Sequence, residues 1–136
     1  MTSAAADLQK ALFSALSEDA ALSGLIGENK VFDHAPADIA FPYLTFGRTS
    51  VFDWSTGTDS GTEQLFTLHI WSKAKGKKET LEIMNVVQNT LQQEPLTLDS
   101  HRLVNLRFEF AEARYDEDLS VHHGLLRFRA ITEEAG

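Results

Sequence analysis

The spacing of apolar residues along the chain predicts two long helices and one short helix. Leu8, Leu12 and Leu16 recur at four-residue intervals, which places them on one face of a helix. Val87 and Leu91 belong to a similar stripe further along. The short helix begins with acidic residues and ends at a glycine, as helices commonly do. The three predicted helices span residues 3–16, 19–26 and 79–92.

Alternating apolar positions predict strands in the centre and at the end of the chain. Each strand should turn one set of side chains toward a core. The sets expected to face inward are Phe66, Leu68 and Ile70; Val104, Leu106, Phe108 and Phe110; and Leu126, Phe128 and Ala130. The predicted strands span residues 30–34, 42–48, 64–71, 103–113 and 121–132, with a short one at 96–98. This order predicts an α+β fold: an antiparallel or mixed sheet with the two main helices on one face and a short extra helix near the N-terminus.

Residues 49–62, between two predicted strands, have the composition of a loop but carry large apolar side chains. The segment is rich in Ser, Thr, Gly and Asp, which predicts a mobile loop. It also holds Val51, Phe52 and Trp54. Exposed apolar side chains of this kind indicate a surface that another molecule covers. The alternative is a loop that folds back over its own sheet.

The composition is that of a globular protein with ordinary amounts of apolar and charged residues. A length of 136 residues suits a single domain, expected over residues 1–136. No apolar run approaches the roughly 18 residues that a membrane helix needs, and the N-terminus lacks the features of a signal peptide. Cysteine is absent, which excludes disulfides and thiolate chemistry.

The charge is acidic and unevenly distributed. The net charge is −8, of which residues 1–68 contribute −6 (three basic and nine acidic side chains) and residues 69–136 contribute −2 (nine and eleven). Proteins that grip nucleic acid normally present a basic face, and the sequence shows no such surplus. The one basic cluster, Lys73, Lys75, Lys77 and Lys78, is interpreted as a solvated turn.

No combination of residues indicates catalysis, a metal or a cofactor. The five histidines lack zinc-type spacing, and His122 and His123 are adjacent, so on a strand they point to opposite faces. His69, on the polar side of its strand and without evident partners, is expected at a solvent-exposed or interface position. Arg107 and Arg129 could meet across strands and pair with Glu109 or Glu112, as structural or interface contacts. We therefore expect a protein that is not an enzyme and binds no metal or cofactor.

The order of several short motifs resembles a known family. They are ALFSALSEDA (residues 11–20), LSGLIG (22–27), VFDH (31–34), AFPYL (40–44), DWS (53–55), LHIWS (68–72), HRLV (101–104) and HGLLRFR (123–129). In this order they resemble the tail-terminator, or tail-completion, proteins of phages with long flexible tails and of phage-derived gene-transfer particles. The resemblance extends over about residues 8–132 and has no large departure.

The resemblance implies a structural component of a virion tail, made in the host cytoplasm. Members form a homo-hexameric ring on the last ring of the tail tube, stop tube growth, and present a surface to the head-side stopper protein. DNA passes through the central hole without specific binding, and no membrane is involved. The family has no catalytic residues to carry over.

The residues themselves supply candidates for these roles. A ring needs two different patches that meet, and aromatic residues often anchor such contacts. The interface candidates are Val51, Phe52, Asp53, Trp54, Trp71, Arg107 and Arg129. Acidic side chains suit a hole that DNA must traverse, and the candidates for lining it are Asp59, Asp116, Glu117 and Asp118. The alternative function is a small α+β enzyme or ligand-binding domain, possibly dimeric, with a pocket between sheet and helices.

Overall fold

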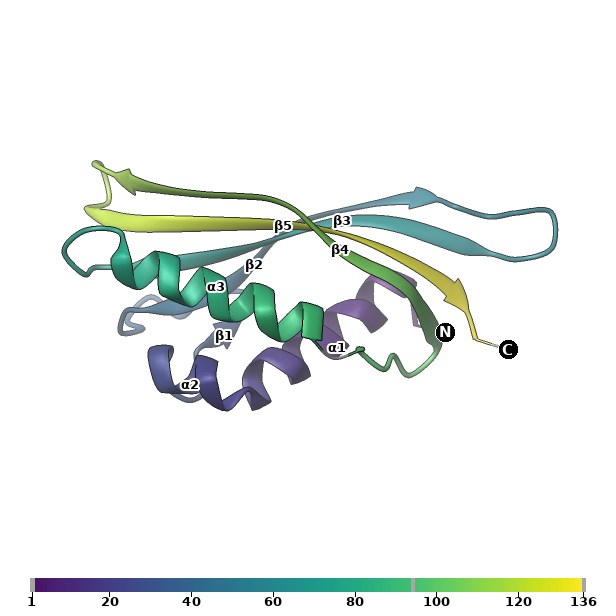
Figure 1. The fold of residues 1–136 in the computed structure, drawn as a ribbon, viewed down its shortest axis with the longest axis horizontal. Coiled ribbons are helices and arrows are strands. Elements are labelled where there is room, and N and C mark those ends of the chain that lie inside the picture. The colour runs from purple at the N-terminus through teal and green to yellow at the C-terminus, as the bar shows by residue number, and fades with distance from the viewer. Residues whose placement is uncertain (1, 94, 136) are drawn as a thin grey trace.

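The computed structural model describes residues 2–93 and 95–135, which form one sheet covered by helices (Figure 1). In chain order the elements are α1 (Ala4–Glu18), α2 (Ala20–Ile26), β1 (Val31–Phe32), β2 (Tyr43–Asp53), β3 (Gly61–Ser72), α3 (Lys78–Gln93), β4 (His101–Asp116) and β5 (Val121–Glu134). The strands lie in the order β1-β2-β3-β5-β4; β1 runs parallel to β2, and the other pairs are antiparallel. The predicted α+β class, with a mixed sheet and helices on one face, is confirmed.

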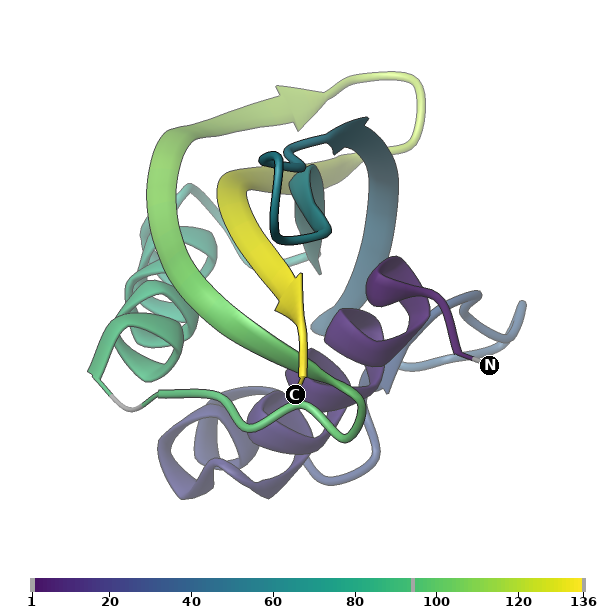
Figure 2. The same ribbon diagram turned by 90° about the vertical axis from the view of Figure 1, so that its right-hand side faces the viewer.

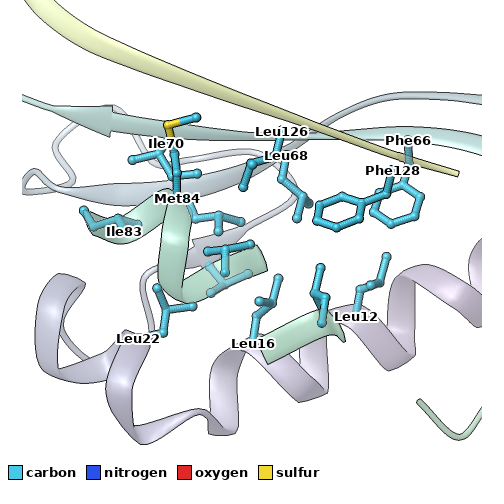
Figure 3. Close-up of a cluster of buried hydrophobic side chains, with 14 of the residues drawn as sticks. Leu12, Leu16, Leu22, Phe66, Leu68, Ile70, Ile83, Met84, Leu126 and Phe128 are labelled. Carbon is cyan, nitrogen blue, oxygen red and sulfur yellow. The ribbon is translucent and has the colours of Figure 1, made fainter. Parts of the chain in front are cut away.

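The core lies between the helices and one face of β3 and β5. Figure 3 shows side chains of both strands pointing toward the helices. Leu68 and Leu126 are register partners on these strands and are fully buried. The alternation predicted for both strands is therefore correct. The other fully or almost fully buried apolar side chains of this core include Leu8, Leu12, Leu16, Leu22, Leu44, Ile70, Ile83, Val87 and Phe128.

The first two helices begin at the caps that their sequence provides. The Ser3 hydroxyl accepts a hydrogen bond from the Ala6 N–H (3.1 Å), and the Asp19 carboxylate accepts one from the Leu22 N–H (2.9 Å). Gly27, with a φ of 94°, ends α2. A positive φ is strained for residues with a Cβ, so glycine fits this stop.

Asp7 joins α1 to the start of β4. Its carboxylate is 2% exposed and accepts hydrogen bonds from the backbone N–H groups of Asp99 (3.1 Å) and Ser100 (2.8 Å). The His101 Nδ1 atom lies 2.8 Å from the same carboxylate. A buried carboxylate is tolerated only with several such partners. The contact therefore connects two elements far apart in sequence.

The loop predicted at residues 49–62 is shorter in the structure, so its predicted bounds are wrong. β2 continues to Asp53 and β3 begins at Gly61, with Val51 opposite Gln64 and Phe52 opposite Glu63. Polar residues suggested a loop, but this part of the hairpin extends past the helices (Figure 1). A strand with little core to cover needs no strict alternation of apolar and polar residues.

Two expectations for the C-terminal third are also wrong. Residues 96–98 form no strand, although Leu98 is buried and contributes to the core. Val104 and Phe110 do not face inward: they are 49% and 40% exposed. The β4–β5 register shifts between Leu103 and Asn105 and again between Phe108 and Phe110. An extra residue at each bulge reverses the alternation, which turns both apolar side chains outward.

The two long hairpins extend to opposite ends of the molecule. In Figure 1 the β2–β3 connection lies at the right, beyond the helices, and the β4–β5 turn lies at the left. The connection from β3 to α3 lies at the same end as the β4–β5 turn, because Ser72 pairs with His122 and Val121 with Asp116. Figure 2, seen from the β2–β3 end, shows that the sheet is strongly twisted above the helices.

Candidate assembly surfaces

The β2–β3 hairpin exposes apolar side chains on both of its faces. Val51 and Phe52 are each 50% exposed and, as consecutive strand residues, point to opposite sides. Trp54 is 49% exposed, with its ring over the Arg129 guanidinium at 5.4 Å. Trp54 thus folds back onto its own sheet, whereas Val51 and Phe52 are half exposed. That another molecule covers Val51 and Phe52 stays a prediction.

The tip of this hairpin is organised by its own hydrogen bonds. The Asp53 carboxylate accepts bonds from the Ser55 hydroxyl (2.7 Å) and the Ser55 N–H (3.1 Å). These bonds lower the pKa of Asp53 below its ordinary value. The Asp59 carbonyl accepts a bond from the Thr56 N–H at 2.8 Å. Asp53 therefore shapes the turn, and its use in an interface stays a prediction, as does mobility of the tip.

Arg107 and Arg129 meet across β4 and β5, as predicted, but their expected acidic partners are wrong. The two residues are direct register partners on the face of the sheet away from the helices. Arg129 Nε donates to Glu63 at 2.6 Å, and Glu109 lies 3.5 Å from Arg127 instead. Arg107 makes no ion pair within the part of the chain that the structure describes. Two like charges side by side leave Arg107 suited to an external acidic group.

Trp71 belongs to a row of stacked rings across the same face. Tyr43, Trp71 and His123 are successive register partners on β2, β3 and β5. The Trp71 and His123 ring centroids are 4.2 Å apart at an interplanar angle of 5°. The Trp71 indole N–H also donates to the Thr45 hydroxyl at 3.0 Å. Trp71 is thus half-buried by contacts within its own chain. Its role in an interface stays a prediction.

His69, which was expected to lack partners, contacts His123 directly. The His69 Nδ1 and His123 Nε2 atoms are 2.6 Å apart, and the two rings stack at 4.9 Å. Burial, together with the neighbouring charges of His69 and Arg114, lowers the pKa of His123 to about 4. Burial also lowers the pKa of His69. This pair could not be predicted from the sequence, because it depends on β3 lying beside β5.

The four acidic residues suggested for a channel lie at two different places. Asp59 is in the β2–β3 tip, whereas Asp116, Glu117 and Asp118 are in or beside the β4–β5 turn at the other end (Figure 1). The Asp116 carboxylate accepts a hydrogen bond from the Leu119 N–H at 3.1 Å, which helps close that turn. The four residues therefore form no single patch within one subunit.

A polar groove of about 490 Å³ lies between α1 and the segment before β4. Several titratable side chains line it, namely Asp7, Lys10, Glu18, Asp19 and Asp99. The Asp7 carboxylate accepts a hydrogen bond from the segment before β4, Lys10 pairs with Asp99 at 2.6 Å, and Asp19 caps α2. Asp7, Lys10, Asp19 and Asp99 thus take part in the protein's own packing, and Glu18 is the remaining titratable side chain of this lining.

Within residues 2–93 and 95–135, no group of three or more His, Cys, Asp or Glu side chains is placed to hold a metal ion. In the same part of the chain, no helix is long and apolar enough to cross a membrane.

The fold is an α+β sheet covered by helices, and comparison with known proteins specifies the class and family of the protein. The chain belongs to the tail completion family described as "Tail completion protein gp17", whose model matches residues 10–133. It is therefore a structural component of a virion tail. A chain from a structure titled "Virion of native gene transfer agent (GTA) particle" is 31% identical, with a TM-score of 0.89 over 98% of this chain and 99% of that one. No curated protein matches significantly.

Proposed function

We propose that this chain, acting as a single domain, forms a hexameric ring at the head-proximal end of a tail tube. The ring ends tube polymerisation and joins the tail to a head-side stopper protein. The observation that carries the proposal is the family match over residues 10–133, supported by near-complete structural similarity to a chain of a gene transfer agent virion. Such a component resides in the virion after synthesis in the host cytoplasm.

The β2–β3 hairpin supports a role in holding the ring or the tube. It extends from the body with Val51 on one face and Phe52 on the other, each half exposed. A strand pair that is apolar on both sides is best covered by two surfaces, as when it inserts between neighbouring subunits. Contacts between different patches of identical subunits generate closed rings when the rotation closes.

The ring carries no chemistry of its own and lets DNA pass. Six copies bring 6 × −8 = −48 formal charges, which opposes tight binding of phosphates in the hole. The acidic residues at Asp59 and at 116–118 are candidates for its lining. The protein has no catalytic, metal or cofactor role in this proposal. The alternative of a ligand-binding domain rests on the groove beside α1, where Lys10 and Asp99 are already paired with each other and Asp7 with the segment before β4.

The test is to remove this chain from cells that produce the particle and to image the products by electron microscopy. We expect tail tubes of uncontrolled length that are not joined to heads. Supplying the wild-type chain should restore tails of uniform length joined to heads. Normal, head-joined tails in the absence of the chain would refute the proposal.

A further inference from the structure

The end of the molecule opposite the β2–β3 hairpin carries two charged surfaces of opposite sign. The basic surface consists of Lys73, Lys75 and Lys77 in the connection before α3, and of Lys78 and Leu81 at the start of that helix. The acidic surface consists of Asp116, Glu117 and Asp118 with Tyr115 and Leu119. All four lysines are exposed, as are Glu117 and Asp118. Leu81, Tyr115 and Leu119 are 50%, 48% and 60% exposed.

Neither surface is neutralised within its own subunit. Among the described residues, Lys75, Lys77, Glu117 and Asp118 have no ion-pair partner, and Lys78 reaches only Glu82, at 3.9 Å. The beginning of β5 lies between the two surfaces. On one side His122 pairs with Ser72 of β3, and on the other side Val121 pairs with Asp116 of β4. Two strand spacings put the backbones at the two surfaces about 10 Å apart. The two surfaces therefore lie at the same end of the sheet, but no ion pair joins them among the described residues.

The two surfaces also face different sides of this end. In Figure 2 the β4–β5 turn lies at the upper right of the far end, whereas the start of α3 lies on the left. Each surface combines a charged rim with an exposed apolar side chain, as protein interfaces commonly do. Their charges, four basic against three acidic, are complementary.

We propose that the basic surface of one copy binds the acidic surface of a neighbouring copy around the ring. Resting on the proposed function, this inference specifies which faces of the subunits meet. In a ring, every copy presents this end in the same direction, so both surfaces lie at the same level. The contact joins two different patches, as a closed ring requires. Leu119 and Leu81 supply its apolar part, and the charges select the orientation.

Charge exchange tests the contact. Lys75→Glu/Lys77→Glu and Glu117→Lys/Asp118→Lys should each fold with the wild-type Tm yet lower the yield of assembled rings by about tenfold. The chain with all four substitutions should restore the yield, because the exchanged side chains on the two surfaces again carry opposite charges. Reversal of Glu18 and Glu28, exposed residues outside both surfaces, serves as the control and should leave ring yield unchanged.

Crosslinking gives a second measurement that does not depend on yield. The chain has no cysteine, so it contributes no background disulfides. Mixed Lys75→Cys and Asp118→Cys subunits should form mixed dimers on oxidation in rings, far more than a mixture of Lys10→Cys and Asp118→Cys.

Two outcomes would overturn the contact. One is normal ring yield from either pair of charge reversals; the other is failure of the fourfold exchange to restore rings although the protein folds. If the wild-type chain forms no ring on the tail tube, the proposed function fails as well. If wild-type rings form and are insensitive to both reversals, only the contact fails.

Discussion

Asp7 is a buried charged residue whose replacement should lower stability. Burial opposes its charge, but hydrogen bonds from His101 and from the Ser100 and Asp99 backbone outweigh this, so the pKa of Asp7 lies below its ordinary value of 3.8. Replacement by Asn puts an N–H₂ group where donors converge. We expect Asp7→Asn to lower the free energy of unfolding by about 2–3 kcal/mol, measured by urea denaturation at pH 7.

The same substitution has a defined pH dependence. A carboxylate with a depressed pKa stabilises the fold above pH 3.8, and this contribution is lost as the pH falls through the lower, folded-state pKa. The difference between wild type and Asp7→Asn should therefore shrink below pH 3.8. Lys10→Met, which removes an exposed ion pair to Asp99, is the control and should change stability little at any pH. A constant difference down to pH 2 would contradict the role of the Asp7 charge.

The pair of His69 and His123 should destabilise the fold in mild acid. The unfolded chain takes up protons near pH 6.5, whereas the folded-state pKa of His123 is about 4. Stability is therefore complete above pH 6.5 and declines as the pH falls toward 4. His123→Gln should reduce the fall in Tm across this window, whereas the exposed His34→Gln should not. Parallel curves for His123→Gln and wild type would show that the pair does not titrate as described.

At the residue scale, the inward or outward direction of side chains was predictable wherever a strand stayed regular. Phe66, Leu68 and Ile70 face the core as expected. Val104 and Phe110 do not, because a bulge is a property of how two strands pair and leaves no mark in the alternation of one of them. The partners of Arg129 and His69 were missed for the same reason: they come from strands that are distant in sequence.

Among the elements, α3 depends on a close approach to β5. A Cβ on Gly124 would lie 2.7 Å from the Met84 Sδ atom and 2.8 Å from Thr80 Cγ2. We expect Gly124→Ala to destabilise the fold by about 1–3 kcal/mol by pushing the helix from the sheet. Gly24→Ala, in α2 with nothing within 4 Å of its Cβ, is the matched control and should stabilise by about 0.5–1 kcal/mol. Equal effects on urea denaturation would contradict the close contact.

The projecting part of the β2–β3 hairpin should matter for assembly more than for folding. Phe52 and Trp54 are half exposed, so Phe52→Ser/Trp54→Ser should leave Tm nearly unchanged and impair the joining of tails to heads. Phe13→Ser, a 45% exposed phenylalanine on α1, is the control and should affect neither. If the double variant fails to fold, the hairpin belongs to the core of its own subunit and the prediction is wrong.

At the scale of elements, the sequence predicted which segments are helices and which are strands, but not where the hairpin ends. The long helices were recognisable because each buries a single stripe of large side chains. The polar residues 49–62 predict a loop because few of their side chains are buried, although β2 continues to Asp53 and β3 already pairs with β5 at Gly61. The buried polar side chain of Gln64 adds no apolar position to the pattern.

For the whole molecule, we expect the isolated protein to bind DNA poorly. The net charge is −8, and the one lysine cluster lies in a turn beside acidic residues. Electrophoretic titration at low salt should show little retention, under conditions where weak electrostatic binding would be visible. Tight, steeply salt-dependent binding that is abolished by alanine at Lys73, Lys75, Lys77 and Lys78 would contradict a passive channel.

At this scale the family was recognisable from the order of short motifs, and the match over residues 10–133 confirms it. The contacts between subunits could not be predicted from the sequence, because an interface depends on which segments lie at the same end of the folded chain. The lysine cluster and the acidic turn are separated by some forty residues, and only the pairing of β3, β5 and β4 brings them to one end.

The most direct test of the central claim is an electron-microscopy reconstruction of the junction between head and tail in purified particles. We predict one ring of six copies at the head-proximal end of the tube, with density that fits this fold. Copies along the length of the tube, copies at the distal tip, or a ring with another number of subunits would contradict the claim.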